Sequence, residues 1–406
     1  MSPNPRRIAL EKLIAIETQG AFSNLALNDL PGDLDPRDRA LIVSLVQGVT
    51  RMRRMLDAVL SRLLAKTPLE GLTPPIRNNL RMGAYQLLCT DIAAHAAIHE
   101  AVKLARRYGH EGVSKLTNGV LRNLQRQADA LTLPEDDPIA ALGVKHSLPD
   151  WLVRRWADQV GLEEAAKLAA SANHPLPLSL RVNRLKIDRA TFIERLAGLG
   201  IAATASPVDP DGVRLPESVP LARIPGYNEG DWYVQGEAAM LVSRIVDPRP
   251  GETVADIGAA PGGKTTHLAA LMNDQGRILA VDPHAGRLGL LAENAKRLGV
   301  TSIEVRTQDG TQRLGEPVDR ALVDAPCSGF GVMYRKADLR WRATPEEVDA
   351  LPALQRRILD AAAADVKPGG IMVYATCTVN HAENQDVVRA FLADHPEFAG
   401  SDLREW

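Results

Sequence analysis

The chain has 406 residues, enough for two or three domains, and its 45% hydrophobic and 24% charged residues are typical of a globular protein. No apolar run approaches the roughly 20 residues needed to cross a bilayer, and a net charge of −2 excludes a general polyanion binder. Three scattered cysteines form neither a disulfide framework nor a CxxC motif. We therefore expect a cytoplasmic protein with no metal and no membrane contact.

Apolar residues recur at three- and four-residue spacing throughout the first third of the chain. This spacing predicts helices, separated by Pro, Gly and Asp, over 5–18, 38–66, 74–89, 96–109 and 113–130. They are expected to form an all-α helical bundle over 1–130. Residues 133–151 break the pattern with prolines and acidic residues and are interpreted as a linker region.

Mixed patterns follow, and they predict a small α+β domain over 140–234. Its expected elements are helices over 149–161, 163–172 and 188–200 and strands over 178–183 and 201–206.

From about Gln235 the pattern becomes apolar strand, Gly or Asp turn, and helix, repeated to the end. Strands are predicted over 253–258, 277–282, 302–307, 320–325 and 371–376. Strands that alternate with helices are typical of parallel βαβ units, so a third domain over 235–406 is expected to be an α/β doubly wound, Rossmann-like sheet.

The stretch "GAAPGGKT", residues 258–265, joins the first of these strands to a helix and permits two interpretations. It satisfies the phosphate-loop pattern G-x-x-x-x-G-K-T, with Asp324 as the magnesium-binding strand end of an NTPase. Alternatively, its small residues let the backbone approach S-adenosylmethionine, with the cofactor carboxylate near the start of the helix. The candidate cofactor residues here are Gly258, Ala259, Ala260, Pro261, Gly262, Gly263 and Lys264.

Four acidic residues favour the second interpretation. The carboxyl ends of parallel strands line one crevice, so Asp256, Asp282, Asp309 and Asp324 should converge there. Carboxylates repel a triphosphate unless metals intervene. They suit an adenosine cofactor instead, with Asp282 at the ribose hydroxyls and Asp309 at the adenine edge. The plain alternative is that such residues only cap strand-to-helix turns.

Three motifs carry a resemblance to a known family. "DIGAAPGGKT", "DAPCSGFG" and "YATCTVNHAEN" resemble, in that order, the motifs of the RsmB/Sun family of 16S ribosomal RNA cytosine-5 methyltransferases. The match covers the whole chain, because "LRMGAYQLL", "AIHEAVKLAR" and "KLTNGVLRNLQR" look like a NusB-like RNA-binding domain. The resemblance implies a class I methyltransferase domain with S-adenosylmethionine as cofactor and ribosomal RNA as partner, in a protein that we expect to be a monomer.

Two cysteines would carry the chemistry of such an enzyme. Carbon 5 of cytosine is a poor nucleophile, and addition of a thiolate to carbon 6 activates it. The resemblance implies that Cys377 attacks, that Cys327 assists product release, and that Asp324 holds the cytosine edge as well as lining the cofactor site. Attack by Cys327 is the alternative, because DNA cytosine-5 methyltransferases attack with a Pro-Cys motif. For an arbitrary cysteine, a buried hydrophobic role is also common.

Basic residues near these motifs are candidates for RNA contact. The run after the Pro-Cys motif offers Arg335, Lys336 and Arg340, beside Trp341, which could stack on a base or close the fold. Arg181 and Asn183 are further candidates in the middle domain. Two basic clusters in the bundle could equally be solvated helix faces: Arg51, Arg53 and Arg54, and Lys103, Arg106 and Arg107.

The sequence departs from the family pattern at two places. Gly258 replaces a common cysteine, and little should be lost because a turn glycine does the same backbone work. The family also continues into a final strand pair that this sequence, ending at Trp406, lacks, so the strand at 371–376 is expected to be an exposed edge with reduced stability. A P-loop NTPase and a catalytically idle RNA-binding module remain the alternative functions.

Overall fold

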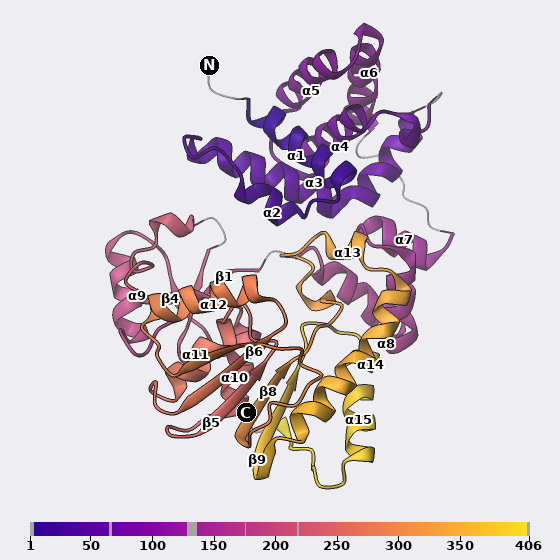
Figure 1. Ribbon diagram of the computed structural model, residues 1–406. Helices are drawn as coiled ribbons and strands as arrows, with labels where there is room; N and C mark the ends of the chain where they lie inside the picture. The colour runs from indigo at the N-terminus through magenta and orange to yellow at the C-terminus, as the bar shows by residue number, and fades with distance from the viewer. Residues whose placement is uncertain (1–3, 65–66, 128–135, 175, 217–218, 404–406) are drawn as a thin grey trace. The chain divides into compact units, whose positions relative to one another are not determined.

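The computed structural model describes residues 4–64, 67–127, 136–174, 176–216 and 219–403 (Figure 1). The chain divides into two compact units, and each unit consists of two segments that are separate in the sequence. Met1–His174 and Phe330–Ala343 form the first, here called the helical unit. Pro175–Gly329 and Thr344–Trp406 form the second, here called the sheet unit.

The helical unit confirms the predicted bundle. Prolines at the first turn and side-chain caps start its helices, as at α1, where Asn4 accepts hydrogen bonds from the backbone of Arg6 and Arg7. Leucine, isoleucine and valine side chains from α1, α3, α4, α5 and α6 form one buried core. The helices are α1 (Pro5–Gln19), α2 (Ser23–Asn28), α3 (Pro36–Leu63), η1 (Leu69–Gly71), α4 (Pro74–Cys89), α5 (Ala94–Tyr108), α6 (Glu111–Gln127), α7 (Pro138–Lys145), α8 (Asp150–Ser171), η4 (Phe330–Val332) and α13 (Leu339–Arg342).

The predicted linker region is wrong in part, because α7 lies inside it. Asp137 caps α7 by accepting a hydrogen bond from the backbone of Ile139, and Pro138 occupies its first turn. The prolines and acidic residues that suggested a linker are therefore helix-start signals. Residues 133–135 of this region lie outside the described residues. The two helices expected over 149–172 form α8, which changes direction at Gly161 with φ of 82°.

A four-stranded antiparallel sheet begins the sheet unit, in the order β2-β3-β1-β4. Helix α9 packs against it around the buried Phe192 and Trp232. The elements are β1 (Leu178–Val182), α9 (Arg189–Gly198), β2 (Thr204–Ala205), β3 (Gly212–Leu215), η3 (Leu221–Arg223) and β4 (Trp232–Val234). The predicted strand over 201–206 shortens to β2, and the sequence patterns did not predict β3 or β4.

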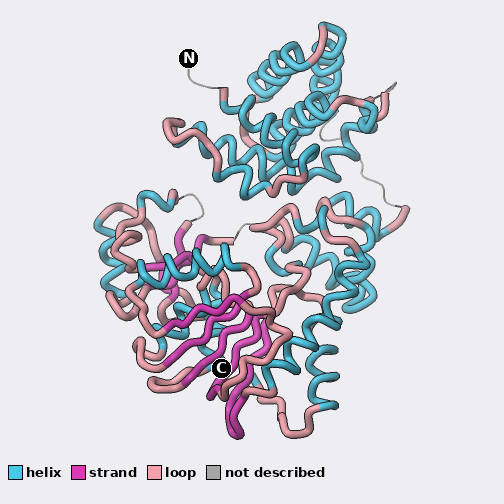
Figure 2. The backbone as a smooth tube through the Cα atoms, in the orientation of Figure 1, coloured by secondary structure: helices cyan, strands magenta, loops and turns pink. Residues whose placement is uncertain are grey.

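A five-stranded parallel sheet confirms the predicted doubly wound fold, with strand order β7-β6-β5-β8-β9 (Figure 2). Helices α10, α11 and α12 pack on one face and α14 and α15 on the other. The elements are α10 (Glu237–Val246), β5 (Thr253–Ile257), α11 (Gly263–Leu271), β6 (Arg277–Asp282), α12 (Ala285–Leu298), β7 (Ile303–Thr307), β8 (Val318–Asp324), α14 (Pro345–Ala363), β9 (Val366–Ala375), η5 (His381–Glu383) and α15 (Gln385–Asp394).

Strand β5 is the point in this sheet where the order of the strands reverses, because β6 and β7 follow on one side of it and β8 and β9 on the other. The loops after β5 and β8 therefore leave in opposite directions and open a crevice at the carboxyl ends of the strands. Among the described residues, β9 pairs only with β8 and forms an edge of the sheet, as expected. No helix in the described part of the chain is long and apolar enough to cross a membrane.

Candidate active site

The loop between β5 and α11 approaches the end of β8 closely. Gly258 has φ of 85°, and a Cβ added there would lie 2.2 Å from the backbone oxygen of Asp324. Gly262 has φ of 100°, and an added Cβ would lie 2.9 Å from Leu291. The glycines therefore let the backbone turn and pack where a side chain would not fit.

An ion pair links this loop to the predicted cytosine-holding residue. Lys264 donates a hydrogen bond from Nζ to Oδ2 of Asp324 at 2.6 Å. Burial alone would lower the pKa of Lys264, but the charge of Asp324 and its hydrogen bond outweigh burial and raise it. The Lys264 side chain is therefore a cation that fixes the position of the Asp324 carboxylate.

A cavity of about 230 Å³ lies beside the same loop. Two buried polar atoms that line it have no hydrogen-bond partner among the described residues: Oδ1 of Asp256 and Nε2 of Gln235. Burial raises the pKa of Asp256 from its usual 3.8 to about 7, while Thr265 donates a hydrogen bond to its other oxygen at 2.6 Å. An unsatisfied acceptor and an unsatisfied donor in one cavity fit the ammonium and carboxylate groups of an amino acid. The cavity lining is Tyr233, Val234, Gln235, Gly236, Ala239, Asp256, Gly258, Ala259, Ala260, Pro261, Gly263, Lys264 and Asp324.

Asp282 and Asp309 end β6 and follow β7, as predicted, but neither lines this cavity. Asp282 is buried, accepts a hydrogen bond from the backbone of His284 at 2.9 Å and pairs with Arg287 at 3.4 Å. Asp309 is exposed and accepts hydrogen bonds from Thr311, which lower its pKa. Their roles at the ribose and adenine stay predictions.

The two motif cysteines lie together. The Sγ atoms of Cys327 and Cys377 are 3.3 Å apart, and the backbone N–H of Cys377 donates to Sγ of Cys327, also at 3.3 Å. The hydrogen bond to Cys377, together with burial, raises the pKa of Cys327. Cys377 is exposed. Strands β8 and β9, paired in parallel, position both loops.

A buried carboxylate that the sequence patterns did not predict as functional holds these two loops. Glu383 accepts a hydrogen bond from the backbone of Ser328 at 2.9 Å and one from the Asn380 amide at 2.9 Å. Gln355 on α14 donates both to Glu383, at 3.0 Å, and to the backbone oxygen of Pro326, at 2.9 Å. Glu383 belongs to the "HAEN" part of the cysteine motif, and this motif is the feature of the sequence that could have identified it.

The predicted RNA-binding residues in the middle domain are buried. Arg181 donates hydrogen bonds to Gln235, to the backbone of Gly263 and to Thr266, and Asn183 donates to two backbone oxygens. They are only 2% and 3% exposed. The expectation that they contact RNA does not fit this geometry, because their donors already join β1 to the cofactor loop and to α12.

The three predicted residues after the Pro-Cys motif separate into two groups. Arg335 and Lys336 are exposed, whereas Arg340 is 1% exposed. Arg340 donates hydrogen bonds to the side chain of Asn173, at 2.9 Å, and to backbone oxygens of the helical unit, including that of Ala172 at 3.0 Å. Burial lowers its pKa to about 9. Arg340 is therefore a packing residue rather than an RNA contact.

One cluster of possible metal ligands lies elsewhere in the sheet unit. Oxygens of Asp209 and Asp211 and a ring nitrogen of His267 lie within 4.8 Å of one another. Arg244 donates to Asp209 at 3.0 Å and to Asp211 at 2.5 Å, so both carboxylates have a cationic partner. Burial lowers the pKa of His267 to about 4, which keeps the ring neutral at pH 7. The two carboxylates of this cluster therefore share one guanidinium, and the neutral ring adds no charge.

Three family models match successive parts of the chain. The model described as 16S rRNA methyltransferase RsmB/F matches residues 243–405. The NusB family matches residues 3–126, and a ferredoxin-like domain of RsmF/B-like methyltransferases matches residues 148–222. Each match falls inside one of the three expected domains, whose exact bounds stay predictions.

Curated relatives and solved structures extend this similarity over the whole chain. A probable ribosomal RNA small subunit methyltransferase B of Synechocystis is 40% identical over 99% of this chain and 91% of its own. Its namesake in Bacillus subtilis is 39% identical over 97% and 89%. The crystal structure of PH0851 is similar with a TM-score of 0.80 and 28% identity over 98% of this chain and 91% of that chain. NSun6 from Pyrococcus horikoshii, solved with SFG, has a TM-score of 0.58 and 25% identity over 61% and 88%.

Proposed function

Because the chain belongs to the 16S rRNA methyltransferase RsmB/F family, we propose that it transfers a methyl group from S-adenosylmethionine to carbon 5 of a cytosine in 16S ribosomal RNA through a covalent cysteine adduct. The observation that carries this proposal is the pair of thiols 3.3 Å apart at the carboxyl ends of two neighbouring strands. Methylation of a nitrogen or a ribose oxygen needs no thiol. Carbon 5 of cytosine does, because it becomes nucleophilic only after addition at carbon 6.

The cavity beside the glycine loop supports S-adenosylmethionine as the methyl donor. When bound, this cofactor supplies an electrophilic methyl group. Asp256 and Gln235 would hold its amino-acid portion through the two polar atoms that lack other partners. NSun6 was solved with SFG, an analogue of this cofactor, which agrees with the assignment.

Cys377 is the proposed nucleophile. Its sulfur adds to carbon 6 of the cytosine as a thiolate, and the electron pair of the carbon 5–carbon 6 double bond then becomes available at carbon 5. The Lys264 ammonium interacts electrostatically with Cys377 and attracts the negative charge of the thiolate. An exposed side chain is also the one that a base leaving its stack can reach.

Asp324 is proposed to bind the N3 and N4 edge of the cytosine. It ends β8, three residues before Cys327, and the Lys264 ammonium holds its carboxylate at 2.6 Å. A carboxyl group in this position favours protonation at N3 as the adduct forms.

Cys327 is proposed to assist release of the product. A water molecule accepts the proton from carbon 5, and the electron pair of that C–H bond re-forms the carbon 5–carbon 6 double bond. The bond between carbon 6 and the Cys377 sulfur breaks, and that sulfur leaves with the electron pair. The raised pKa of Cys327 keeps its proton on sulfur near pH 7. The Cys327 S–H can therefore donate a hydrogen bond to the leaving sulfur 3.3 Å away.

The test is to trap the adduct. The protein is incubated with 16S ribosomal RNA and S-adenosylmethionine, and covalent complexes are separated on a denaturing gel. Cys327→Ser should accumulate the complex, because attack proceeds and release does not. Cys377→Ser should give no complex and no 5-methylcytidine in the digested RNA. Cys89→Ser, which changes the third cysteine, should behave as the parent protein.

The opposite pattern would make Cys327 the nucleophile. A complex in neither variant, together with methylation at a position other than carbon 5, would overturn the proposal. Melting of the protein with each ligand provides an independent check: S-adenosylmethionine at about 100 times its Kd should stabilise the fold by about 2.7 kcal/mol, whereas ATP with magnesium should not.

A further inference from the structure

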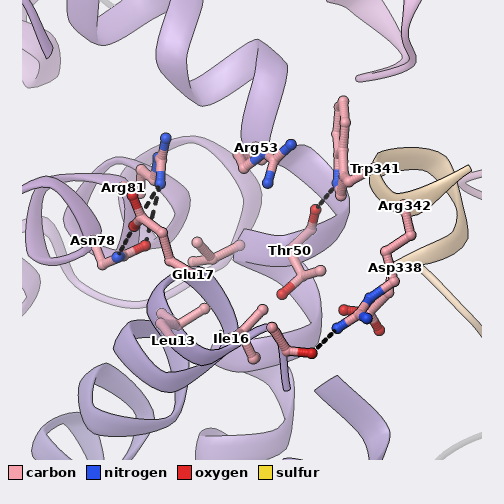
Figure 3. Close-up of a pocket in the computed structure, with 12 residues that line it drawn as sticks. Leu13, Ile16, Glu17, Thr50, Arg53, Asn78, Arg81, Asp338, Trp341 and Arg342 are labelled. Atoms are coloured by element: carbon pink, nitrogen blue, oxygen red, sulfur yellow. Dashed lines mark hydrogen bonds and ion pairs between the residues drawn. The ribbon is translucent and has the colours of Figure 1, made fainter. Parts of the chain in front are cut away.

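A second cavity, of about 250 Å³, lies within the helical unit (Figure 3). One wall comes from α1, α3 and α4, and the other from α13 and the residue before it. The lining is Leu13, Ile16, Glu17, Gly20, Val49, Thr50, Arg53, Asn78, Arg81, Asp338, Trp341 and Arg342. Nothing in the proposed reaction uses this cavity, which is lined by three arginines and two carboxylates.

Two arginines of this cavity, Arg53 and Arg342, form no ion pair among the described residues, and Arg342 donates instead to the backbone oxygens of Gly20 and Ala21. The guanidinium of Arg53 lies over the ring of Trp341, 4.3 Å from the ring centroid, as Figure 3 shows. Its N–H groups donate no hydrogen bond to the residues that the structure describes, although the side chain is half-buried. Trp341 is itself fixed, because its ring nitrogen donates to the backbone oxygen of Thr50 at 2.7 Å. A partly buried guanidinium that is held flat, and whose N–H groups bond to none of the described residues, can bind an oxyanion.

The hydroxyl of Thr50 adds a second unsatisfied group to the same cavity. Thr50 is 6% exposed, and its Oγ1 has no hydrogen-bond partner in the described part of the chain. Thr50 lies three residues before Arg53 on α3, so both side chains lie on the same face of that helix. Buried hydroxyl groups normally form a hydrogen bond, so a ligand or a water molecule is expected to bond to this one.

Both carboxylates of the cavity already accept hydrogen bonds from the protein. Glu17 pairs with Arg77 and with Arg81, and it also accepts a hydrogen bond from Asn78. Asp338 accepts two hydrogen bonds from Ser23, one of them from its backbone N–H at 3.1 Å. The lining contains three arginines against two carboxylates, so an anion that enters the cavity meets a net positive charge, with the Arg53 guanidinium free of protein acceptors among the described residues.

We propose that this cavity binds a phosphodiester group of the RNA substrate through Arg53 and Thr50, an inference that rests on the proposed function. A phosphodiester carries one negative charge and two oxygens that accept from a guanidinium fork and a hydroxyl together. The RNA is favoured over a free phosphate because Trp341, against which the Arg53 guanidinium stacks, belongs to the segment directly after the Pro-Cys motif. The same segment presents Arg335 and Lys336 to solvent.

Binding of 16S ribosomal RNA to the full chain, measured without cofactor as a function of salt, tests this site. Arg53→Gln should lower the affinity about tenfold, because it removes a charge-assisted hydrogen bond. It should also reduce the slope of log K against log salt by about 0.7 to 0.9, the contribution of one phosphate contact. The matched control is Arg62→Gln, the same charge change at an exposed position of the same helix, which should leave both values unchanged.

Thr50→Val separates the hydroxyl from the charge. It should weaken RNA binding about threefold to fivefold, the effect of one neutral hydrogen bond, with no change in the salt slope. It removes a buried polar atom without a partner, so its melting temperature should not fall. This variant keeps the proposal testable if Arg53→Gln proves unstable.

The proposal is overturned if Arg53→Gln and Arg62→Gln have the same affinity and slope. It is equally overturned if 10 mM inorganic phosphate raises the melting temperature of the parent but not of Arg53→Gln while RNA binding is identical, because the anion would then be a free phosphate. These readouts need no methyl transfer. A failed site with normal 5-methylcytidine formation therefore differs clearly from a failed function.

Discussion

Cys327 and Cys377 differ in exposure although their sulfur atoms lie 3.3 Å apart. The hydrogen bond to Cys377 and burial both raise the pKa of Cys327, so its thiolate fraction at pH 8 is small. In a Cys89→Ser background we expect iodoacetamide at pH 8 to alkylate Cys377 first. Mass spectrometry of peptides after partial reaction measures the order. Equal or faster labelling of Cys327 would contradict both the assigned hydrogen bond and the choice of nucleophile.

The buried carboxyl of Asp256 should give the stability of the protein a distinct dependence on pH. Its pKa rises from 3.8 to about 7 in the folded chain. Between these values the folded state keeps a proton that the unfolded state has released, so the free energy of unfolding falls as pH rises. Asp256→Asn cannot ionise. The melting temperature of this variant minus that of the parent should therefore increase from pH 5 to pH 8 without ligand.

Asp309→Asn is the matched control for this measurement. Hydrogen bonds from Thr311 lower the pKa of Asp309, so its titration lies below the tested range. Its contribution to stability is present above the unfolded pKa and lost only as pH falls below it. The difference between Asp309→Asn and the parent should be constant from pH 5 to pH 8. A constant difference for Asp256→Asn as well would show that burial does not raise the pKa of Asp256 in the folded chain.

At this scale the sequence predicted the two thiols, the glycine loop and Asp324, because short motifs with special chemistry carry their own signal. It did not predict Glu383, since a glutamate in a short helical turn is usually exposed. Glu383 holds the two cysteine loops through four hydrogen bonds from residues 328, 355 and 380. The pairing of β8 with β9 and the packing of α14 on the sheet bring those residues together.

The buried Arg181 joins two elements of the sheet unit, β1 and α11. It donates to the Thr266 hydroxyl at 2.8 Å and to two other acceptors, and burial lowers its pKa to about 10. Arg181→Gln should lower the free energy of unfolding by about 2 to 4 kcal/mol, because buried acceptors lose their donor. Arg184→Gln is the control: Arg184 is exposed and makes no hydrogen bond to a described residue. Its change should stay within about 0.5 kcal/mol.

Urea unfolding measures both variants. Equal stability of Arg181→Gln and Arg184→Gln would contradict the buried role and restore RNA contact as the interpretation of Arg181.

The sequence predicted the five parallel strands because each is a continuous apolar run between Gly and Asp turns. It did not predict β3 or β4, of four and three residues, because their stability comes from antiparallel pairing with the distant β1.

For the whole molecule, the segment Phe330–Ala343 connects elements of the sheet unit but packs in the helical unit. Arg340 holds it there with hydrogen bonds to oxygens of residues 51, 146, 147, 172 and 173. Arg340→Gln should therefore lower the free energy of unfolding of the helical unit by about 2 to 4 kcal/mol. Lys336→Gln, at an exposed position in the same segment, should leave stability unchanged and weaken RNA binding instead.

Thermal unfolding and RNA binding, measured on both variants, give opposite patterns if this division is correct. A stable Arg340→Gln with weak RNA binding would contradict it.

The sequence assigned all three basic residues of this run to RNA, because charge alone does not separate a buried arginine from an exposed one. The distinction depends on acceptors supplied by residues more than 160 positions earlier, such as Asn173.

The same segment has a consequence for biosynthesis. A chain emerging from the ribosome presents residues 1–174 long before it presents Arg340, Trp341 and the rest of Phe330–Ala343. Until then the backbone oxygens that Arg340 binds have no donor from this segment, and the wall that closes the Arg53 cavity has not been made. The N-terminal helices can collapse early, but their final packing must wait until most of the sheet has been synthesised. We therefore expect the complete Arg53 cavity to be absent from a chain whose synthesis has stopped before residue 330.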